Sequence, residues 1–320
     1  MGVGPHAFLP LAPFTSQGIC HVLFPEEGLL EPDTLLIGTD SHTCTYGAYG
    51  VLSVGVGTTD LTEVMASGRI WLKVPESIRI ELNGRMAKGV HAKDVILHIL
   101  HQVTMNGFTD AVVEFTGPAL EHLTEDDRST IANMVVEGGG TCGLFPVGAI
   151  RADEGASFQK LLSFDLTDMA PHVAPPFKPD SGIPVADLEE TEIDVAWIGS
   201  CTGGKLEDLA AAAEVLDGHK VASSVRLIVS PATLSIMETA GERGYLRTFL
   251  SAGGQVVPPS CGACLGMGPG TLNDGEIGVF ASNRNFKGRA GTGSVYLASP
   301  ATVAASAIAG RIADPRPFLA

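Results

Sequence analysis

Residues 195–204 read VAWIGSCTGG, a short apolar run that ends in a glycine-rich turn. The run is too short for a helix but suits a buried strand. The positions that follow, 205–216, have helical spacing. Because a buried strand, a tight loop and a helix form the repeating unit of parallel α/β sheets, we expect a parallel α/β fold. Cys201 would lie between strand and helix, where the helix dipole favours a thiolate.

The alternation of strands and helices continues through the last third of the chain. Two earlier changes in the sequence pattern divide the part that precedes it. Further elements are expected as strands at 227–229 and 279–280 and helices at 231–240 and 301–312. The earlier changes are at Pro75 and in a proline-rich stretch, 153–187, which reads as a linker or a long ordered connection. The sequence therefore predicts three units, at 1–75, 76–188 and 189–320. Residues 1–15, with three prolines and no periodicity, read as an irregular lead-in.

A second glycine-rich loop carries two more cysteines. Residues 258–266 read PPSCGACLG, and the C-x-x-C pair Cys261 and Cys264 can turn two thiolates toward one centre. With Cys201 they make three thiolates without an obvious fourth. A structural zinc site needs four ligands, so three suit an iron–sulfur cubane with one open iron, which could act as a Lewis acid. A C-x-x-C pair alone could also be a redox pair.

Composition limits the classes of function. The 320 residues are 45% apolar and 18% charged, and 20 Lys and Arg against 36 Asp and Glu give a net charge of −16. That charge opposes binding to nucleic acid or to an anionic membrane surface. No apolar run reaches the roughly 18 residues that span a bilayer, so we expect a cytoplasmic protein with no nucleic-acid or membrane partner. In a reducing compartment, cysteines are more often metal ligands than disulfides.

Candidate acid and base groups lie near the amino terminus. The apolar run 35–38 predicts a strand that delivers Asp40, Ser41 and His42 to its carboxyl end, where ligands bind in open α/β sheets. His21 precedes the strand. These side chains suit general acid–base chemistry, although Asp and Ser also cap helices and a histidine can simply be satisfied locally.

Two further groups of polar residues stand out. A helix predicted over 125–136 ends at Glu137, before three glycines, where a carboxylate is unfavourable for the helix dipole; it is a candidate functional group or a solvated helix end. Arg284 and Arg289, on a polar loop, suit bidentate binding of carboxylates, although surface arginines are the simpler interpretation. The helix predicted over 92–103 also carries two histidines, which we expect to be solvated or at the core edge.

Taken together, five stretches resemble the aconitase superfamily, specifically the large subunits of the 3-isopropylmalate dehydratase type and their homoaconitase and dimethylmalate dehydratase relatives. The resemblance runs from about Ser16 to the end of the chain. The stretches are GICH at 18–21, GTDSHT at 38–43, GSCT at 199–202, CGACLG at 261–266 and NRNFKGR at 283–289. The chain departs from the family pattern at Val22, Gly203 and Ala263, and in the short region before Gly18.

The resemblance implies aconitase-like three-layer α/β/α domains around a central cluster cleft, with the first domain incomplete. It implies a [4Fe–4S] cluster on Cys201, Cys261 and Cys264. Further roles are implied for an acid network of His21, Asp40 and His42, for Glu137 as a catalytic carboxylate, and for substrate contacts by Ser41, Asn133, Arg284 and Arg289. The reaction would be the dehydration and rehydration of a malate-type 2-hydroxy acid.

The resemblance also implies a partner. In the family the carbon base is a serine on a mobile domain, which in two-subunit members is a separate small protein, so we expect a heterodimer or heterotetramer with a small di- or tricarboxylic substrate. Isopropylmalate isomerisation in leucine biosynthesis is the leading expectation. The alternatives are a homoaconitase or dimethylmalate dehydratase subunit and a truncated or non-catalytic protein of this fold. An RNA-binding regulator is disfavoured by the charge of −16.

Overall fold

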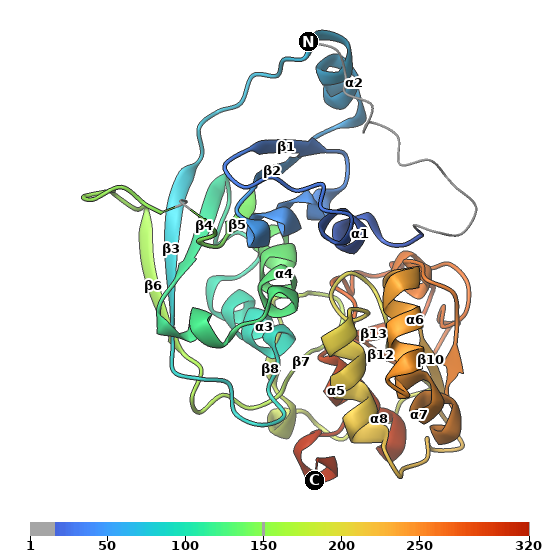
Figure 1. Ribbon diagram of the computed structural model, residues 1–320. Coiled ribbons are helices and arrows are strands. Elements are labelled where there is room, and N and C mark those ends of the chain that lie inside the picture. The colour runs from blue at the N-terminus through green and yellow to red at the C-terminus, as the bar shows by residue number, and fades with distance from the viewer. Residues whose placement is uncertain (1–16, 149–150, 320) are drawn as a thin grey trace.

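The computed structural model describes residues 17–148 and 151–319; the lead-in predicted over residues 1–15 lies outside this part. The described chain forms three β-sheets with helices between and around them (Figure 1). The helices are α1 Cys20–Glu26, α2 Thr58–Ser67, α3 Ala92–Val103, α4 Glu125–Met134, α5 Leu206–Leu216, α6 Leu234–Glu242, α7 Tyr245–Ala252 and α8 Pro300–Ala309. Among the described residues, none of the helices is long and apolar enough to cross a membrane.

The first two sheets lie in the amino-terminal half. A two-stranded parallel sheet pairs β1 with β2, and a four-stranded parallel sheet has the order β5-β4-β3-β6. The strands are β1 Leu35–Gly38, β2 Leu52–Gly55, β3 Glu76–Asn83, β4 Ala111–Thr116, β5 Cys142–Leu144 and β6 Lys160–Asp165. The strand predicted at 35–38 and the helix predicted at 92–103 are confirmed to the residue.

The third sheet has seven strands in the order β11-β10-β9-β12-β13-β7-β8. They are β7 His172–Ala174, β8 Ile183–Pro184, β9 Val195–Ile198, β10 Arg226–Val229, β11 Gln255–Val256, β12 Ile277–Phe280 and β13 Ser294–Ala298. The five strands from β9 to β13 are parallel, and only β7 and β8 are antiparallel. The predicted parallel α/β pattern is therefore confirmed.

The stretch 153–187 carries more structure than its proline content predicted. It contains β6, β7 and β8, and β6 pairs with β3 while β7 pairs with β13. Consequently β7 and β8 join the third sheet although they precede residue 189, the expected start of the third unit. The division into units at 1–75, 76–188 and 189–320 stays a prediction.

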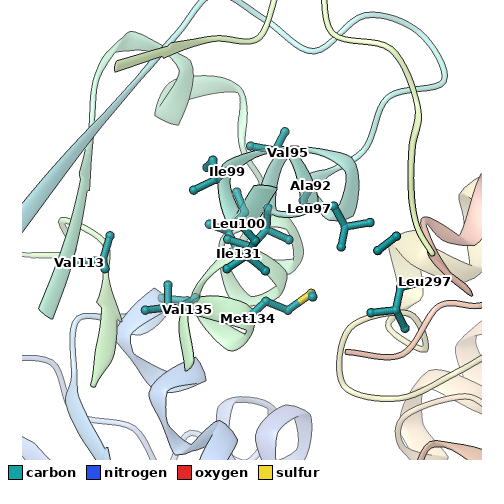
Figure 2. Close-up of a cluster of buried hydrophobic side chains, with 14 of the residues drawn as sticks. Ala92, Val95, Leu97, Ile99, Leu100, Val113, Ile131, Met134, Val135 and Leu297 are labelled. Atoms are coloured by element: carbon teal, nitrogen blue, oxygen red, sulfur yellow. The ribbon is translucent and has the colours of Figure 1, made fainter. Parts of the chain in front are cut away.

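Strand β9 shows how the third sheet is buried on both faces. Ala196 and Ile198 belong to the core formed with α5, α6, α7 and α8. Val195 and Trp197 point the other way, as the two-residue period of a strand requires, and join the core of α3, α4 and the four-stranded sheet. Figure 2 shows this second core, in which Leu297 of β13 lies beside Leu97 of α3. The second core therefore joins the two larger sheets.

Candidate active site

The candidate site lies at the carboxyl edge of the seven-stranded sheet. The parallel strand β9 is flanked by β10 on one side and by β12 on the other, so the chain leaves β9 in one direction and later returns on its opposite side. Such a switch point opens a crevice outside the strand ends. The loop after β9 carries Cys201, and the loop after β12 carries Arg284. The backbone amide of Ile19 donates to the carbonyl of Ala232, after β10, at 2.9 Å and so brings α1 to the same edge.

The Cys201 loop has an unusual backbone. Ser200 adopts a φ of 73°, a left-handed conformation that costs a non-glycine residue about 1–2 kcal/mol. Cys201 itself is buried, at 6% exposure. The side-chain amides of Asn133 and Asn283 donate to its sulfur at 3.2 and 3.4 Å, and Asn283 also donates to Asn133 Oδ1 at 3.0 Å. Two donors directed at one sulfur would stabilise it as a thiolate.

Cys261 and Cys264 lie at a short 3-10 helix, η6 Gly262–Leu265. The amide of Cys264 donates to the carbonyl of Cys261 at 3.0 Å, and Gly262 adopts a φ of 43° in this turn, which glycine tolerates without strain. Burial, followed by the nearby Cys201 and Cys264, raises the pKa of Cys261 to about 12. Burial and then Cys201 also raise the pKa of Cys264. Cys201 therefore lies close enough to Cys261 and Cys264 to oppose their ionisation.

The donor set fits an iron–sulfur cubane better than a single metal ion. All six cysteines are free. Within the described ranges, no three His, Cys, Asp or Glu side chains are placed to hold one metal ion. In a cubane each thiolate binds a different iron, so the sulfurs surround the cluster and need not meet at one ion. The buried Cys201 and Cys264 and the half-buried Cys261, with amide donors at Cys201, match that requirement.

An acid–base chain runs from α1 to the 3-10 helix that follows α4. His21 Nε2 donates to Asp40 Oδ1 at 2.8 Å, and the same oxygen accepts the backbone amide of His42 at 2.7 Å because Asp40 caps the 3-10 helix Ser41–Tyr49. His42 Nε2 in turn bonds Glu137 Oε1 at 2.9 Å. Glu137 lies in a second 3-10 helix, Val135–Gly138, after α4 ends at Met134, two residues earlier than predicted.

The first pair of this chain is ionic at neutral pH. Hydrogen bonds from His21 and then from His42 hold the pKa of Asp40 far below its usual range. Burial is the largest single influence on His21 and lowers its pKa, but the hydrogen bond to Asp40 and further favourable interactions outweigh it and raise the pKa to about 10. His21 is therefore an imidazolium beside a carboxylate, and this pair orients His42.

The two predicted arginines occupy different surroundings. Arg284 Nε donates to Glu137 Oε1 at 2.6 Å, and its Nη1 donates to Ser41 Oγ at 2.9 Å, so Arg284 joins the acid–base chain. Arg289 lies nearer the thiols, where its charge partly offsets the effect of burial on the pKa of Cys264. Its buried Nε has no hydrogen-bond partner among the described residues. A buried, unpaired guanidinium N–H is suited to an anionic ligand.

The structure brings most of the predicted residues together and adds others. Asn133 bonds both Cys201 and the hydroxyl of Thr45, at 2.7 Å, and therefore links the thiols to the helix that carries His42. Thr45 and Asn283 were not expected. Asn283 could have been found, because it is adjacent to Arg284 in the 283–289 motif, whereas Thr45 has no sequence signal that separates it from its neighbours. The roles of the site residues remain predictions.

Fold and site together define the class: an α/β protein in which a set of thiols and an acid–base chain meet at a sheet switch point. The model of the aconitase family (aconitate hydratase) matches residues 6–150 and 186–310. This chain belongs to the aconitase family, and its α/β fold is the one expected from the sequence.

Individual relatives are similar over nearly the whole chain. The 3-isopropylmalate dehydratase large subunit of Desulfosudis oleivorans is 46% identical, with 93% of this chain and 75% of the relative covered. That of Geobacter sulfurreducens is 42% identical, with coverage of 98% and 80%. The 3-isopropylmalate dehydratase large subunit 1 of Methanopyrus kandleri is 42% identical, with coverage of 95% and 77%. Aconitase X of Thermococcus kodakaraensis, a solved structure, has a TM-score of 0.49 at 13% identity over 83% of this chain and 66% of that one, too distant a likeness to identify the fold.

Proposed function

We propose that this chain is the cluster-bearing large subunit of a [4Fe–4S] hydro-lyase that isomerises isopropylmalate in leucine biosynthesis. The observation that carries the proposal is the meeting of Cys201, Cys261 and Cys264 with the chain His21–Asp40–His42–Glu137 at one switch point. The names of relatives at 42–46% identity support the choice of substrate. A cytoplasmic location remains our expectation.

Elimination of water from a 2-hydroxy acid needs a Lewis acid at the hydroxyl, a proton donor to it and a base at the neighbouring carbon. A cluster held by Cys201, Cys261 and Cys264 would supply the Lewis acid. His42 is the central proton carrier of this chain, since its Nε2 lies 2.9 Å from Glu137 and its backbone is fixed by Asp40. The His21–Asp40 ion pair keeps Asp40 negative, so the proton of this pair is favoured on the His21 imidazole over the Asp40 carboxylate.

Arg284 and Ser41 would orient the substrate. A guanidinium has five N–H donors, and the two bonds to Glu137 and Ser41 use two of them, which leaves donors for a substrate carboxylate. The Arg284 side chain is 18% exposed while that of Glu137 is 2% exposed, so the arginine lies between solvent and the buried carboxylate. An incoming carboxylate would therefore meet Arg284 before it meets Glu137.

The carbon base is expected from a partner. No residue of the described site has been assigned that role, and the relatives' designation as large subunits supports a small subunit that completes the site. We infer a heterodimer or heterotetramer that acts on a small di- or tricarboxylic 2-hydroxy acid.

The test is anaerobic reconstitution of the chain with iron and sulfide, followed by absorbance and electron paramagnetic resonance (EPR) spectroscopy and by assay with a cognate small subunit. We expect a cubane signal and turnover of isopropylmalate. A loaded protein that turns over only homocitrate-type or dimethylmalate-type substrates would change the substrate assignment. No cluster with all three cysteines intact would contradict the hydro-lyase proposal itself.

A further inference from the structure

Lys93 is a fully buried lysine that no part of the proposed reaction uses. Its side chain belongs to α3 and is 1% exposed. The ammonium Nζ donates to Thr202 Oγ1 at 2.8 Å, to the carbonyl of Ala281 at 3.0 Å and to the carbonyl of Ser282 at 2.7 Å. All three N–H donors of the lysine are therefore used, and every acceptor is a neutral oxygen.

The helix places Lys93 on its face toward the third sheet. Residues four apart share one face of a helix, so Lys93 lies on the same side of α3 as Leu97. Figure 2 shows Leu97 on the side of α3 that faces Leu297 of β13. The amino end of that face reaches the carboxyl edge of the sheet, where the ammonium meets the loops after β9 and β12.

These contacts join the two loops of the candidate site. Thr202 directly follows Cys201, and Ser282 directly precedes Asn283, whose amide donates to the Cys201 sulfur at 3.4 Å. The Lys93 ammonium thus fixes the Thr202 hydroxyl, next to Cys201 in sequence. It also fixes the Ser282 carbonyl, next to Asn283, which donates to the Cys201 sulfur. A small displacement of Lys93 would therefore move both the Cys201 loop and the loop that carries Asn283.

The Lys93 ammonium has no hydrogen bond to a carboxylate, whereas Lys205, the other buried lysine of this region, has one. Lys205 Nζ pairs with Asp208 at 2.9 Å and also donates to Thr130 Oγ1 at 2.7 Å. Asp94, next to Lys93, is engaged by the backbone amides of His91 and His172. A buried ammonium without a partner anion loses hydration free energy that neutral acceptors offset only in part.

The charged groups around Lys93 indicate which anions would balance its ammonium. Burial lowers the pKa of Lys93 to about 7; Asp208, already paired with Lys205, opposes this, and so do the thiols of Cys201 and Cys264, while Lys205 adds to the lowering. Unlike Asp208, neither thiol is paired with a lysine: at Cys201, Lys205 donates only to the backbone carbonyl, at 3.3 Å, and the cation near Cys264 is Arg289. The two thiols would become thiolates on binding a cluster, and the added negative charge would then favour the ammonium.

We propose that Lys93 is the internal counter-cation of the iron–sulfur site, whose ammonium balances the thiolates of Cys201 and Cys264 and holds the loops after β9 and β12 in place. This rests on the proposed cluster. Lys93 is a positioning residue, since it touches neither the expected substrate nor the sulfurs. Because a nearby positive charge stabilises the more negative, reduced form of a cluster, Lys93 should also raise the reduction potential of the cluster.

The test compares Lys93→Gln with the double variant Lys205→Gln/Asp208→Asn. The first removes an unbalanced charge and keeps an amide donor, whereas the second removes a balanced pair from the same region without changing the net charge. Each protein is reconstituted anaerobically, and its iron affinity, its EPR-monitored reduction potential and its thermal unfolding with and without cluster are measured.

For Lys93→Gln we expect an iron affinity about 10–100-fold lower, a more negative potential, and a greater loss of stability in the loaded protein than in the apoprotein. The double variant should lose similar stability in both forms and keep the wild-type potential. If Lys93→Gln does not fold, Lys93→Met, which has a similar apolar stem, replaces it in the same measurements.

The outcomes separate this proposal from the function on which it rests. A wild-type protein that takes up no cluster overturns both. A wild-type protein that takes up the cluster, with Lys93→Gln equal to it in iron affinity and potential, overturns the counter-cation role alone. Failure of both Lys93 variants to fold without cluster would assign the lysine to the fold itself and would also overturn the proposal.

Discussion

The acid–base chain and the cysteine loops face the same crevice but are organised in different ways. His21, Asp40, His42 and Glu137 are joined by hydrogen bonds of 2.7–2.9 Å, and His21, His42 and Glu137 are buried. At the cysteines, amide donors reach the Cys201 sulfur at 3.2 and 3.4 Å, and burial raises the pKa of Cys261 and Cys264. Folding alone therefore completes the acid–base chain, whereas the raised pKa of Cys261 and Cys264 means that these two thiols need a bound cation to become thiolates.

The largest effect should come from removing one thiol. In Cys264→Ser we expect iron uptake to fall and turnover to drop by more than about 100-fold, because a ligand is lost outright. The free energy of unfolding of the apoprotein should change by only about 1 kcal/mol, since serine can still bond Asn283 Oδ1. Iron analysis after reconstitution and urea unfolding of the apoprotein measure the two effects.

Cys142 provides the matched control. It is a buried cysteine of β5 that lies 3.6 Å from the hydroxyl of Ser53, away from the three candidate ligands. Cys142→Ser should leave iron uptake unchanged. Equal losses in the two variants would remove the distinction between the cysteine loops and the rest of the core.

The next effect tests the acid–base chain. In Glu137→Gln the shape of the side chain is kept but the carboxylate that bonds both His42 and Arg284 is lost, so kcat should fall by about 10²–10⁴-fold while iron uptake persists. Steady-state kinetics on reconstituted enzyme with its small subunit would measure this.

The same substitution at a surface ion pair is the control. Glu276 pairs with Arg226 at 2.6 Å in an exposed position. Glu276→Gln should leave kcat unchanged and alter the free energy of unfolding by less than about 1 kcal/mol. A Glu137→Gln enzyme with wild-type kcat would show that the acid–base chain is structural.

A smaller effect concerns the packing of the Cys201 loop. A Cβ added at Gly203 would lie 2.3 Å from Ala281 Cβ and 2.6 Å from the Ala281 carbonyl oxygen. Gly203→Ala should therefore destabilise the protein by about 1–3 kcal/mol, through displacement of the same loops that Lys93 joins.

Gly241→Ala is the comparison, because a Cβ there meets its nearest atom at 3.6 Å and the helix α6 continues through it. It should stabilise the protein by about 0.4–1 kcal/mol. Chemical denaturation of both variants decides the sign, and a stable Gly203→Ala protein would mean that the loop adapts without cost.

The smallest effect is the pH dependence of the His21–Asp40 pair. The pKa of His21 is raised to about 10 in the folded protein, so the folded state retains a proton that the unfolded chain loses near pH 6.5. Stability from this pair is thus complete below about pH 6.5 and declines as pH rises toward 10. Since the Asp40 side chain is 55% exposed, solvent screening limits the loss to under about 1 kcal/mol.

Urea unfolding at pH 6 and pH 9.5 can measure this decline. The wild-type protein should lose more stability across the interval than His21→Gln, which has no such proton. The same loss in both proteins would show that the ion pair does not contribute. At the acid end the depressed pKa of Asp40 adds stability above about pH 4, which falls away as the pH drops further.

Local signals explain which parts of the fold could be predicted. The strand at Leu35–Gly38 is a short apolar run and the helix at Ala92–Val103 has a complete amphipathic pattern, and the bounds of both agree with the structure. The strands β6, β7 and β8 have no such pattern, because their order comes from pairing with distant strands. Prolines in the same stretch suggested a connection, and tertiary pairing overrode that signal.

The site shows the same limit. His21, Asp40 and His42 fall within 22 positions and form one chain of hydrogen bonds, as expected from their closeness in sequence. The Lys93 contact with Thr202 spans 109 positions. Nothing in an amphipathic helix distinguishes a lysine that meets a distant loop from one that meets solvent, so Lys93 could be identified only from the packing.

The burial of Trp197 makes the candidate site open to optical measurement. The protein has two tryptophans: Trp71 is 87% exposed, while Trp197 is fully buried. The Trp197 ring lies against both cysteine loops, since a Cβ at Gly199 would come within 2.7 Å of it and one at Gly262 within 3.6 Å. An iron–sulfur cluster absorbs broadly in the near ultraviolet and should quench the blue-shifted emission of this indole, while the red-shifted emission of Trp71 persists. The intrinsic fluorescence of the chain should thus report, in real time, whether its cysteine loops are loaded.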